Sequence, residues 1–112
     1  MIRLPTRSRS VQSMADRTKL LTEDEIVEWL PSLPRWERRG RNLHRELSFR
    51  DFIEAFGFLT MVALVAERLN HHPDWSNSWN KVVLDVSNHA AGGLTEIDFE
   101  LANAIDKALG EH

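Results

Sequence analysis

The stretch from Ser48 to Asn70 constrains the fold most, because it is the one long segment with the apolar spacing of a helix. Ser48-Phe-Arg-Asp51 is a helix-capping signal, and we expect a helix from about Arg50 to Asn70. Its apolar face is broader than contact with one sheet requires. The helix therefore either lies at the centre of the fold or also packs on another subunit. Gly57, in mid-helix, costs about 1 kcal/mol relative to alanine, which suggests a close approach there.

Shorter elements flank this helix on both sides. Residues 36–47 alternate around a Gly40-Arg-Asn42 turn, and residues 75–79 and 81–87 alternate again, so each pair of segments predicts two adjacent strands. Capping boxes at Thr22–Glu25 and Thr95–Asp98 predict a first and a last helix. The order α-β-β-α-β-β-α indicates an α+β fold, in which a four-stranded antiparallel sheet carries the helices on one face.

The length of 112 residues fits a single domain, which we place at residues 20–112. Residues 1–19 are rich in arginine and serine, and we expect a disordered basic leader. An organelle transit peptide and a start codon placed too early, with Met14 as the true beginning, are the alternatives. Five of the 14 basic and one of the 17 acidic residues lie in residues 1–20, so a net charge of +4 there leaves −7 for the rest.

Composition excludes several function classes. The net charge of −7 beyond residue 20 argues against nucleic acid as a direct partner. The chain has no cysteine, which excludes disulfides, thiol nucleophiles and Cys-containing metal sites, and is compatible with the cytoplasm, where we place the protein. The most apolar run, residues 55–66, is too short to span a bilayer, so we expect no contact with a membrane.

Adjacent histidines close the long helix, in the run Glu67-Arg-Leu-Asn-His71-His72-Pro73, and His89 follows later. Adjacent side chains diverge, so His71 and His72 are poor co-ligands, and we expect no metal. Imidazoles titrate near neutral pH and suit general acid–base catalysis, which needs no cofactor. Glu67 precedes His71 by four residues, so a shared helical face would let this carboxylate fix the imidazole tautomer.

The same residues allow plainer interpretations. A cationic imidazole at His71 or His72 suits a helix C-terminus, and Asp98 is the third residue of a capping box whose charge complements the helix dipole. Glu67 can simply pair with a nearby cation. We expect His44, in the second strand, and His112 to be ordinary solvated or hydrogen-bonded surface residues.

The spacing from the histidine pair onward resembles the signature of the pterin-4a-carbinolamine dehydratase family. Three further segments agree with that family. They are Phe49–Phe58 (FRDFIEAFGF), Asn77–Val82 (NSWNKV) and Gly93–Ala102 (GLTEIDFELA). The likeness runs from about Leu20 to Leu109, nearly all of the chain beyond the leader.

The resemblance implies a homodimer or homotetramer that converts 4a-hydroxytetrahydrobiopterin to quinonoid dihydrobiopterin and water, in tetrahydrobiopterin recycling. By the same resemblance His71, His72 and His89 are the catalytic set, with the first two as acids and the third as base. Glu67 and Asp98 are supporting residues. The substrate contacts it implies are Asn70, His71, His72, Trp79, Ser87, Asn88, His89 and Ala90.

This chain departs from the family pattern at four of these positions. Asn70 stands where aspartate is frequent, Asn88 where threonine is common, Ala90 where glutamate occurs, and Trp79 where tyrosine is frequent. The first three differences bear on which pterin side chain is preferred and on the affinity for the pterin. The resemblance also admits other functions: a non-enzymatic partner protein, such as a transcription coactivator or Rubisco-assembly factor, or action on another pterin, such as a molybdopterin precursor.

Overall fold

The computed structural model describes residues 17–111, so most of the predicted leader, residues 1–19, lies outside the described residues, as does His112. The elements follow the predicted order, with one added 3-10 turn, η3, after the first helix. They are α1 (Glu23–Trp29), η3 (Leu30–Ser32), β1 (Glu37–Arg39), β2 (Asn42–Ser48), α2 (Phe52–Leu69), β3 (Asp74–Ser78), β4 (Lys81–Val86) and α3 (Glu96–Ala108).

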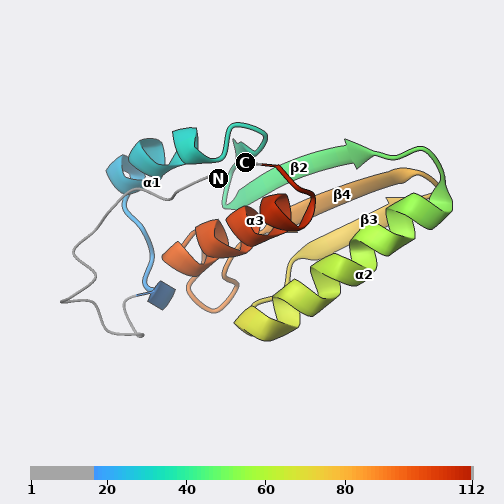
Figure 1. The fold of residues 1–112 in the computed structure, drawn as a ribbon. Coiled ribbons are helices and arrows are strands. Elements are labelled where there is room, and N and C mark those ends of the chain that lie inside the picture. The colour runs from blue at the N-terminus through green and yellow to red at the C-terminus, as the bar shows by residue number, and fades with distance from the viewer. Residues whose placement is uncertain (1–16, 112) are drawn as a thin grey trace.

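The four strands form one antiparallel sheet in the order β1-β2-β4-β3, and this confirms the predicted α+β fold. The helices lie on one side of the sheet (Figure 1). Strand β4 shows why: Val82, Leu84 and Val86 are buried, while the alternate residues are exposed or half-buried. The opposite face of the sheet is polar and has no helix over it among the described residues.

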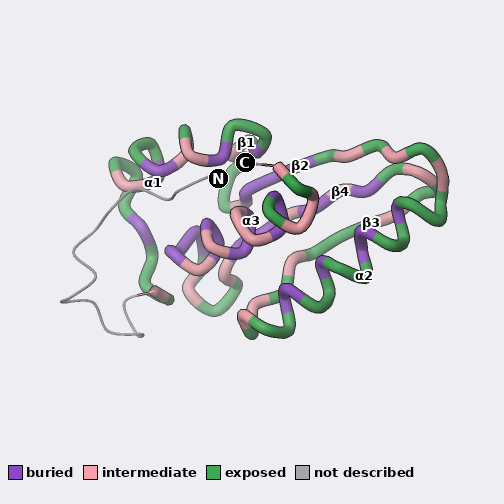
Figure 2. The backbone as a smooth tube through the Cα atoms, viewed as in Figure 1, coloured by how far each residue is buried: buried purple, intermediate pink, exposed green. Residues whose placement is uncertain are grey.

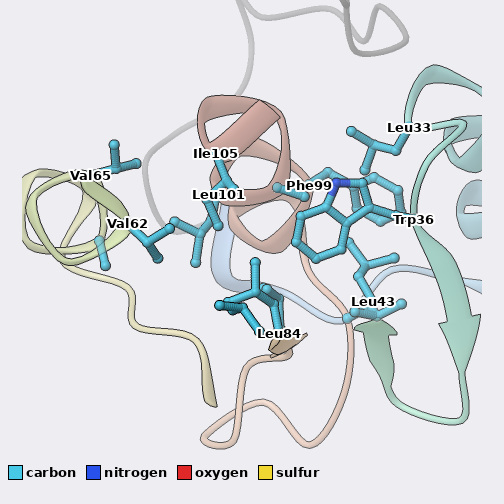
Figure 3. Close-up of a cluster of buried hydrophobic side chains, with 14 of the residues drawn as sticks. Leu33, Trp36, Leu43, Val62, Val65, Leu84, Phe99, Leu101 and Ile105 are labelled. Atoms are coloured by element: carbon cyan, nitrogen blue, oxygen red, sulfur yellow. The ribbon is translucent and has the colours of Figure 1, made fainter. Parts of the chain in front are cut away.

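The core lies where α2 and α3 cover the sheet. Figure 3 shows Val62 of α2 and Leu101 of α3 beside Leu84 of the sheet. The Trp29 ring meets the Phe99 ring edge to face, with 5.5 Å between ring centroids, which fastens α1 to α3. Burial of this kind supplies most of the driving force for folding.

Local chemistry sets the ends of the helices. The capping box predicted at Thr22 is present, with Glu25 N–H to Thr22 Oγ1 at 3.1 Å and Thr22 N–H to Glu25 Oε1 at 2.9 Å. For α2 the predicted start is two residues early, because Asp51 rather than Ser48 caps the helix and accepts the Glu54 N–H at 2.9 Å. Asn70 ends α2 in the left-handed conformation, with φ of 52°, so the chain leaves the helix just before the two histidines.

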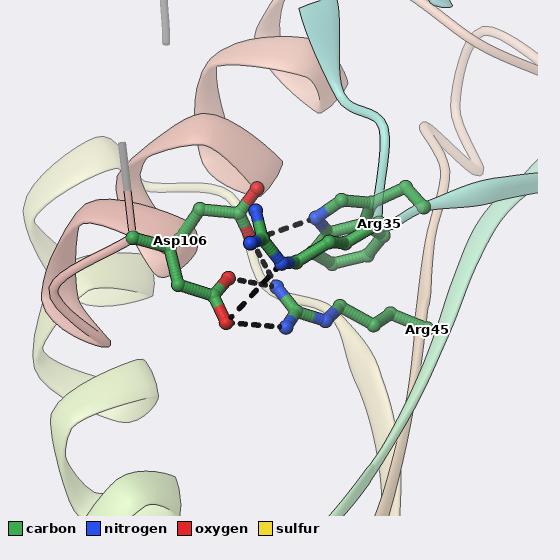
Figure 4. Close-up of polar contacts among 5 residues, drawn as sticks. Arg35, Arg45 and Asp106 are labelled. Atoms are coloured by element: carbon green, nitrogen blue, oxygen red, sulfur yellow. Dashed lines mark hydrogen bonds and ion pairs between the residues drawn. The ribbon is translucent and has the colours of Figure 1, made fainter. Parts of the chain in front are cut away.

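A buried charge network joins the sheet to the end of α3. Arg45 Nη1 lies 2.5 Å from Asp106 Oδ1 and 2.8 Å from Glu111 Oε1, and Trp36 Nε1–H donates to the same Asp106 oxygen at 2.8 Å. Figure 4 shows Arg45 reaching from β2 toward Asp106, with Arg35 alongside. Burial alone would lower the pKa of Arg45, but hydrogen bonding to Glu111 and the charge of Asp106 raise it. Burial raises the pKa of the Asp106 carboxyl.

Much of α2 is exposed to solvent (Figure 2), and its outer face is apolar. The buried residues of α2 face the core, and a second apolar set points to solvent. This set comprises Phe52, Ile53, Phe56, Met61 and Leu64. The close approach predicted at Gly57 is wrong for the described chain, since a methyl group there would meet nothing within 4 Å. Of the two explanations for the broad apolar face, the exposure of this set excludes a position of α2 at the centre of the fold.

Candidate active site

The three histidines predicted as the catalytic set lie at one end of the molecule. His71 and His72 stand between the end of α2 and the start of β3, and His89 follows the end of β4. Because β3 and β4 are antiparallel, with Asp74 opposite Asp85, the beginning of β3 and the end of β4 meet at the same edge. The start of α3 reaches the same region, since Asp98 contacts His71.

His71 is held by a fully buried carboxylate. Its Nε2 lies 2.5 Å from Asp98 Oδ1, and its side chain is 14% exposed. The other oxygen of Asp98 accepts the Thr95 backbone N–H at 2.7 Å and the Thr95 hydroxyl at 3.0 Å. Asp98 therefore fills both roles that the sequence left open, because one oxygen caps α3 and the other orients an imidazole.

Glu67 contacts His72 rather than His71, which corrects the expected pairing. The distance from His72 Nε2 to Glu67 Oε1 is 2.9 Å. The prediction extended the helical i, i+4 rule to residue 71, but α2 ends at Leu69 and Asn70 turns left-handed. Beyond that turn the helical projection no longer applies, so the two histidines diverge, one toward α3 and the other toward α2.

His89 lies on a short loop that Asn88 shapes. The Asn88 side-chain oxygen accepts the Ala91 N–H at 3.0 Å, and its backbone bonds with Gly92 and Gly93 close the loop before α3. His89 Nε2 lies 3.3 Å from Asp74 Oδ2. Asp74 comes two residues after His72, so this contact links the loop of His89 to the segment that carries His71 and His72.

A common arrangement unites the three histidines. Each presents Nε2 to a carboxylate, and among residues 17–111 none of their Nδ1 atoms has a hydrogen-bond partner. With Nε2–H donated to the carboxylate, a neutral ring offers Nδ1 as a base, and a protonated ring offers Nδ1–H as an acid. The arrangement can therefore take up or deliver protons at three positions around one end of the sheet.

His44 differs from these three: it is hydrogen-bonded, one of the two expected alternatives, but it is buried rather than at the surface. It is 7% exposed, with Nδ1 2.7 Å from Asp85 Oδ1 and Nε2 2.8 Å from Glu46 Oε2. Both ring nitrogens are occupied, so His44 has no free position for substrate. Burial alone would lower its pKa, but the hydrogen bonds to Glu46 and Asp85 raise the pKa above the usual value.

This raised pKa predicts a pH-dependent contribution of His44 to stability. A pKa that is higher in the folded than in the unfolded chain stabilises the fold below the unfolded value of about 6.5. That contribution is lost as pH rises through the folded pKa. In an NMR titration we expect the His44 ring to show a midpoint above 6.5, and the Glu46→Gln and Asp85→Asn variants each to lower it. A wild-type midpoint at or below 6.5 would contradict the geometry.

A pocket of about 360 Å³ opens on the polar face of the sheet beside His89. Its size is at the lower end of the usual range for small-molecule sites. Neither His71 nor His72 lines it. The lining residues are Arg41, Asn42, Asp74, Asp85, Ser87, Asn88, His89, Gly92 and Gly93. Sequence reasoning missed Arg41, Asn42, Asp74 and Asp85, because only the strand register brings them next to the 88–93 loop.

The remaining predicted contacts fall into two groups. Asn70 adjoins His71, and Ser87 and Ala90 flank the loop of His89, so all three lie at the histidine end. Trp79 does not, because it lies on the β3–β4 turn, before β4, whereas His89 follows that strand. The strand has six residues that rise about 3.3 Å each, which puts Trp79 roughly 20 Å from this end.

Residues 17–111 contain neither a cluster of metal ligands nor a membrane-spanning helix. No three His, Asp or Glu side chains of these residues converge as metal ligands. In the same part of the chain, every helix is too short or too polar to cross a membrane.

Comparison with known proteins assigns this chain to a family. The family model described as pterin 4 alpha carbinolamine dehydratase matches residues 19–108. This chain belongs to that family. A protein of Prochlorococcus marinus, named provisionally as a pterin-4-alpha-carbinolamine dehydratase, is 47% identical over 88 residues, covering 79% of this chain and 92% of the relative. A Solibacter usitatus protein with the same provisional name is 47% identical over 89 residues, covering 80% and 94%.

Two solved structures share the fold. A crystal structure described as a transcriptional coactivator/pterin dehydratase from Brucella melitensis has a TM-score of 0.74 and 38% identity, covering 78% of this chain and 95% of that one. A pterin dehydratase-like protein described as a RuBisCO assembly factor in the alpha-carboxysome has a TM-score of 0.57 and 19% identity, covering 70% and 90%. At that identity the second likeness concerns the fold alone.

Proposed function

We propose that this protein dehydrates a 4a-hydroxytetrahydropterin, with 4a-hydroxytetrahydrobiopterin as the substrate in tetrahydrobiopterin recycling, by acid–base catalysis through His71, His72 and His89. Family membership supports the substrate class. The observation that carries the mechanism is the shared arrangement of the three histidines, each with a carboxylate on Nε2 and an Nδ1 that has no partner among residues 17–111.

The reaction requires two proton transfers. A proton must reach the 4a-hydroxyl oxygen so that the C–O bond breaks and water leaves. The ring N–H must lose its proton so that its electrons form the C=N bond. One protonated and one neutral imidazole supply both steps near neutral pH, each step contributing about 10²–10⁴-fold. No redox change occurs, and the two proton transfers balance.

We assign the one acid step to His71 and His72, which would serve the two faces of the pterin, and the base step to His89. The carboxylates of Asp98 and Glu67 each contact Nε2 and so orient His71 and His72 for proton delivery through Nδ1. The contact from His89 to Asp74 is longer, at 3.3 Å, and His89 lines the pocket, where a neutral ring can accept the proton. The test is acceleration of 4a-hydroxytetrahydropterin decay by the purified protein, followed by ultraviolet absorbance.

The outer face of α2 favours a binding role in addition to catalysis. A helix that is apolar all round is normally covered on every side, yet Ile53 and Leu64 are 82% and 68% exposed. We propose that a second copy of this chain covers this face in a homodimer or homotetramer. A different protein partner would occupy the same surface and would leave the purified protein monomeric.

Disruption of the outer α2 face should dissociate the assembly. We expect light scattering to show a dimer or tetramer for the natural protein and a smaller species for Phe56→Glu combined with Leu64→Glu. Both residues are exposed, so the folded chain should retain its helical circular dichroism. The control is Val27→Glu on α1, since Val27 is 67% exposed but lies outside α2. A monomeric natural protein, or dissociation by the Val27 variant as well, would rule out self-association through α2.

A further inference from the structure

Two aspartates face each other on the floor of the pocket beside His89. Asp74 on β3 is the register partner of Asp85 on β4, and both line the pocket. Like charges directly opposite each other on neighbouring strands are destabilising unless each is compensated. Here Asp74 contacts His89 at 3.3 Å, and Asp85 contacts His44 at 2.7 Å.

Asp85 is held in place from behind. His44 is nearly buried, and its Nδ1 contacts Asp85 while its Nε2 contacts Glu46. Only Oδ1 of Asp85 is used, and Oδ2 has no hydrogen-bond partner among residues 17–111. The Asp85 side chain is 33% exposed. It is therefore an oriented carboxylate with acceptor capacity left for a ligand in the pocket.

We propose that Asp85 determines ligand specificity by accepting hydrogen bonds from the amino-pyrimidinone edge of a pterin. This inference rests on the proposed function and names how its substrate class is recognised. That edge carries two adjacent donors, the ring N3–H and the exocyclic 2-amino group. Two parallel donors match a carboxylate in the same bidentate manner as a guanidinium does. The nearby charge of Asp74 adds to the preference for a donor-rich edge.

The position agrees with the proposed chemistry. His89 and Asp85 line the same pocket, so a ring held by its donor edge at Asp85 lies beside the proposed base. In a pterin the carbon that bears the 4a-hydroxyl is separated from N3 only by the ring carbonyl carbon. Recognition by Asp85 and proton removal by His89 can therefore act on one bound bicyclic ring, whereas His71 and His72 lie outside the lining of this pocket.

The test compares equilibrium binding of pterin and of lumazine, which has the same bicyclic ring with an oxo group in place of the 2-amino group. An oxo group facing Asp85 would repel it, so we expect the natural protein to bind pterin more tightly by roughly tenfold or more. Asp85→Asn and Asp85→Thr should remove the preference. Asn can even reverse it, because its amide also donates.

Glu46→Gln is the matched control, because Glu46 contacts the same His44 ring but does not line the pocket. This variant should keep the preference for pterin. Equal binding of the two ligands by the natural protein overturns the proposal. So does a preference that survives in both folded Asp85 variants, or one that Glu46→Gln abolishes equally. Thermal unfolding of each variant establishes that it is folded.

Because the readout is binding, it separates this inference from catalysis. A protein that prefers pterin through Asp85 but does not accelerate dehydration would refute the proposed reaction and keep the role of Asp85. If the protein accelerates dehydration but its preference for pterin over lumazine does not depend on Asp85, only the role of Asp85 is refuted.

Discussion

Replacing His72 or His89 with alanine is expected to lower the dehydration rate by about 10²–10⁴-fold, because each removal deletes one proton transfer. Both side chains are more than half exposed, at 57% and 76%, and neither is part of the core. The loss should therefore appear in kcat while the temperature of thermal unfolding changes little. Stopped-flow absorbance of 4a-hydroxytetrahydropterin decay measures it.

The graded control for this prediction is Glu67→Gln. This variant keeps His72 but removes the negative charge of the carboxylate that contacts its Nε2. We expect an intermediate kcat with little change in KM, since Glu67 positions His72 without touching substrate. His71→Ala is less informative, because it leaves Asp98 buried without its imidazole. Rates unchanged in both His72→Ala and His89→Ala would contradict the assignment of the catalytic set.

Breaking the buried network of Arg45 is expected to cause the largest loss of stability. Arg45 and Asp106 are 8% and 0% exposed. Removing Arg45 leaves the buried Asp106 without its cation, and removing Asp106 leaves Arg45 with Glu111 alone and the Trp36 N–H without its acceptor. Arg45→Met and Asp106→Leu should each lower the free energy of unfolding by about 3–5 kcal/mol. Denaturation in urea, followed by circular dichroism, measures both.

Two controls sharpen this prediction. The double variant Arg45→Met with Asp106→Leu should be more stable than the less stable single variant, since it removes both charges together. Arg35→Ala should change the free energy of unfolding by less than about 1 kcal/mol, because Arg35 is 49% exposed and 3.6 Å from Glu111. Equal losses for Arg35→Ala and Arg45→Met would show that burial does not govern the effect.

The fold was largely predictable because its signals are local. The capping residues Thr22 and Thr95 and the alternation through β4 mark element ends and faces within a few residues of sequence. The charge network was not predictable, since Arg45 and Asp106 lie 61 residues apart and each interrupts an apolar pattern. Only the three-dimensional packing shows that the two interruptions meet.

The site was predictable in its histidines but not in most of their partners. His71 contacts Asp98 across 27 residues, and His44 contacts Asp85 across 41, so no helical or strand periodicity could pair them. The pairing of Glu67 was wrong by one residue, because the left-handed turn at Asn70 lies between the helix and the histidines. The roles of His71, His72 and His89 stay predictions until activity is measured.

The most direct test of the central claim is the decay of 4a-hydroxytetrahydropterin with and without the purified natural protein. The substrate is generated at neutral pH, and its conversion to the quinonoid dihydropterin is followed by ultraviolet absorbance. We predict that the protein accelerates the decay in proportion to its concentration, and that the His72→Ala and His89→Ala variants largely lose this acceleration. A decay rate that the natural protein leaves unchanged would contradict dehydratase activity.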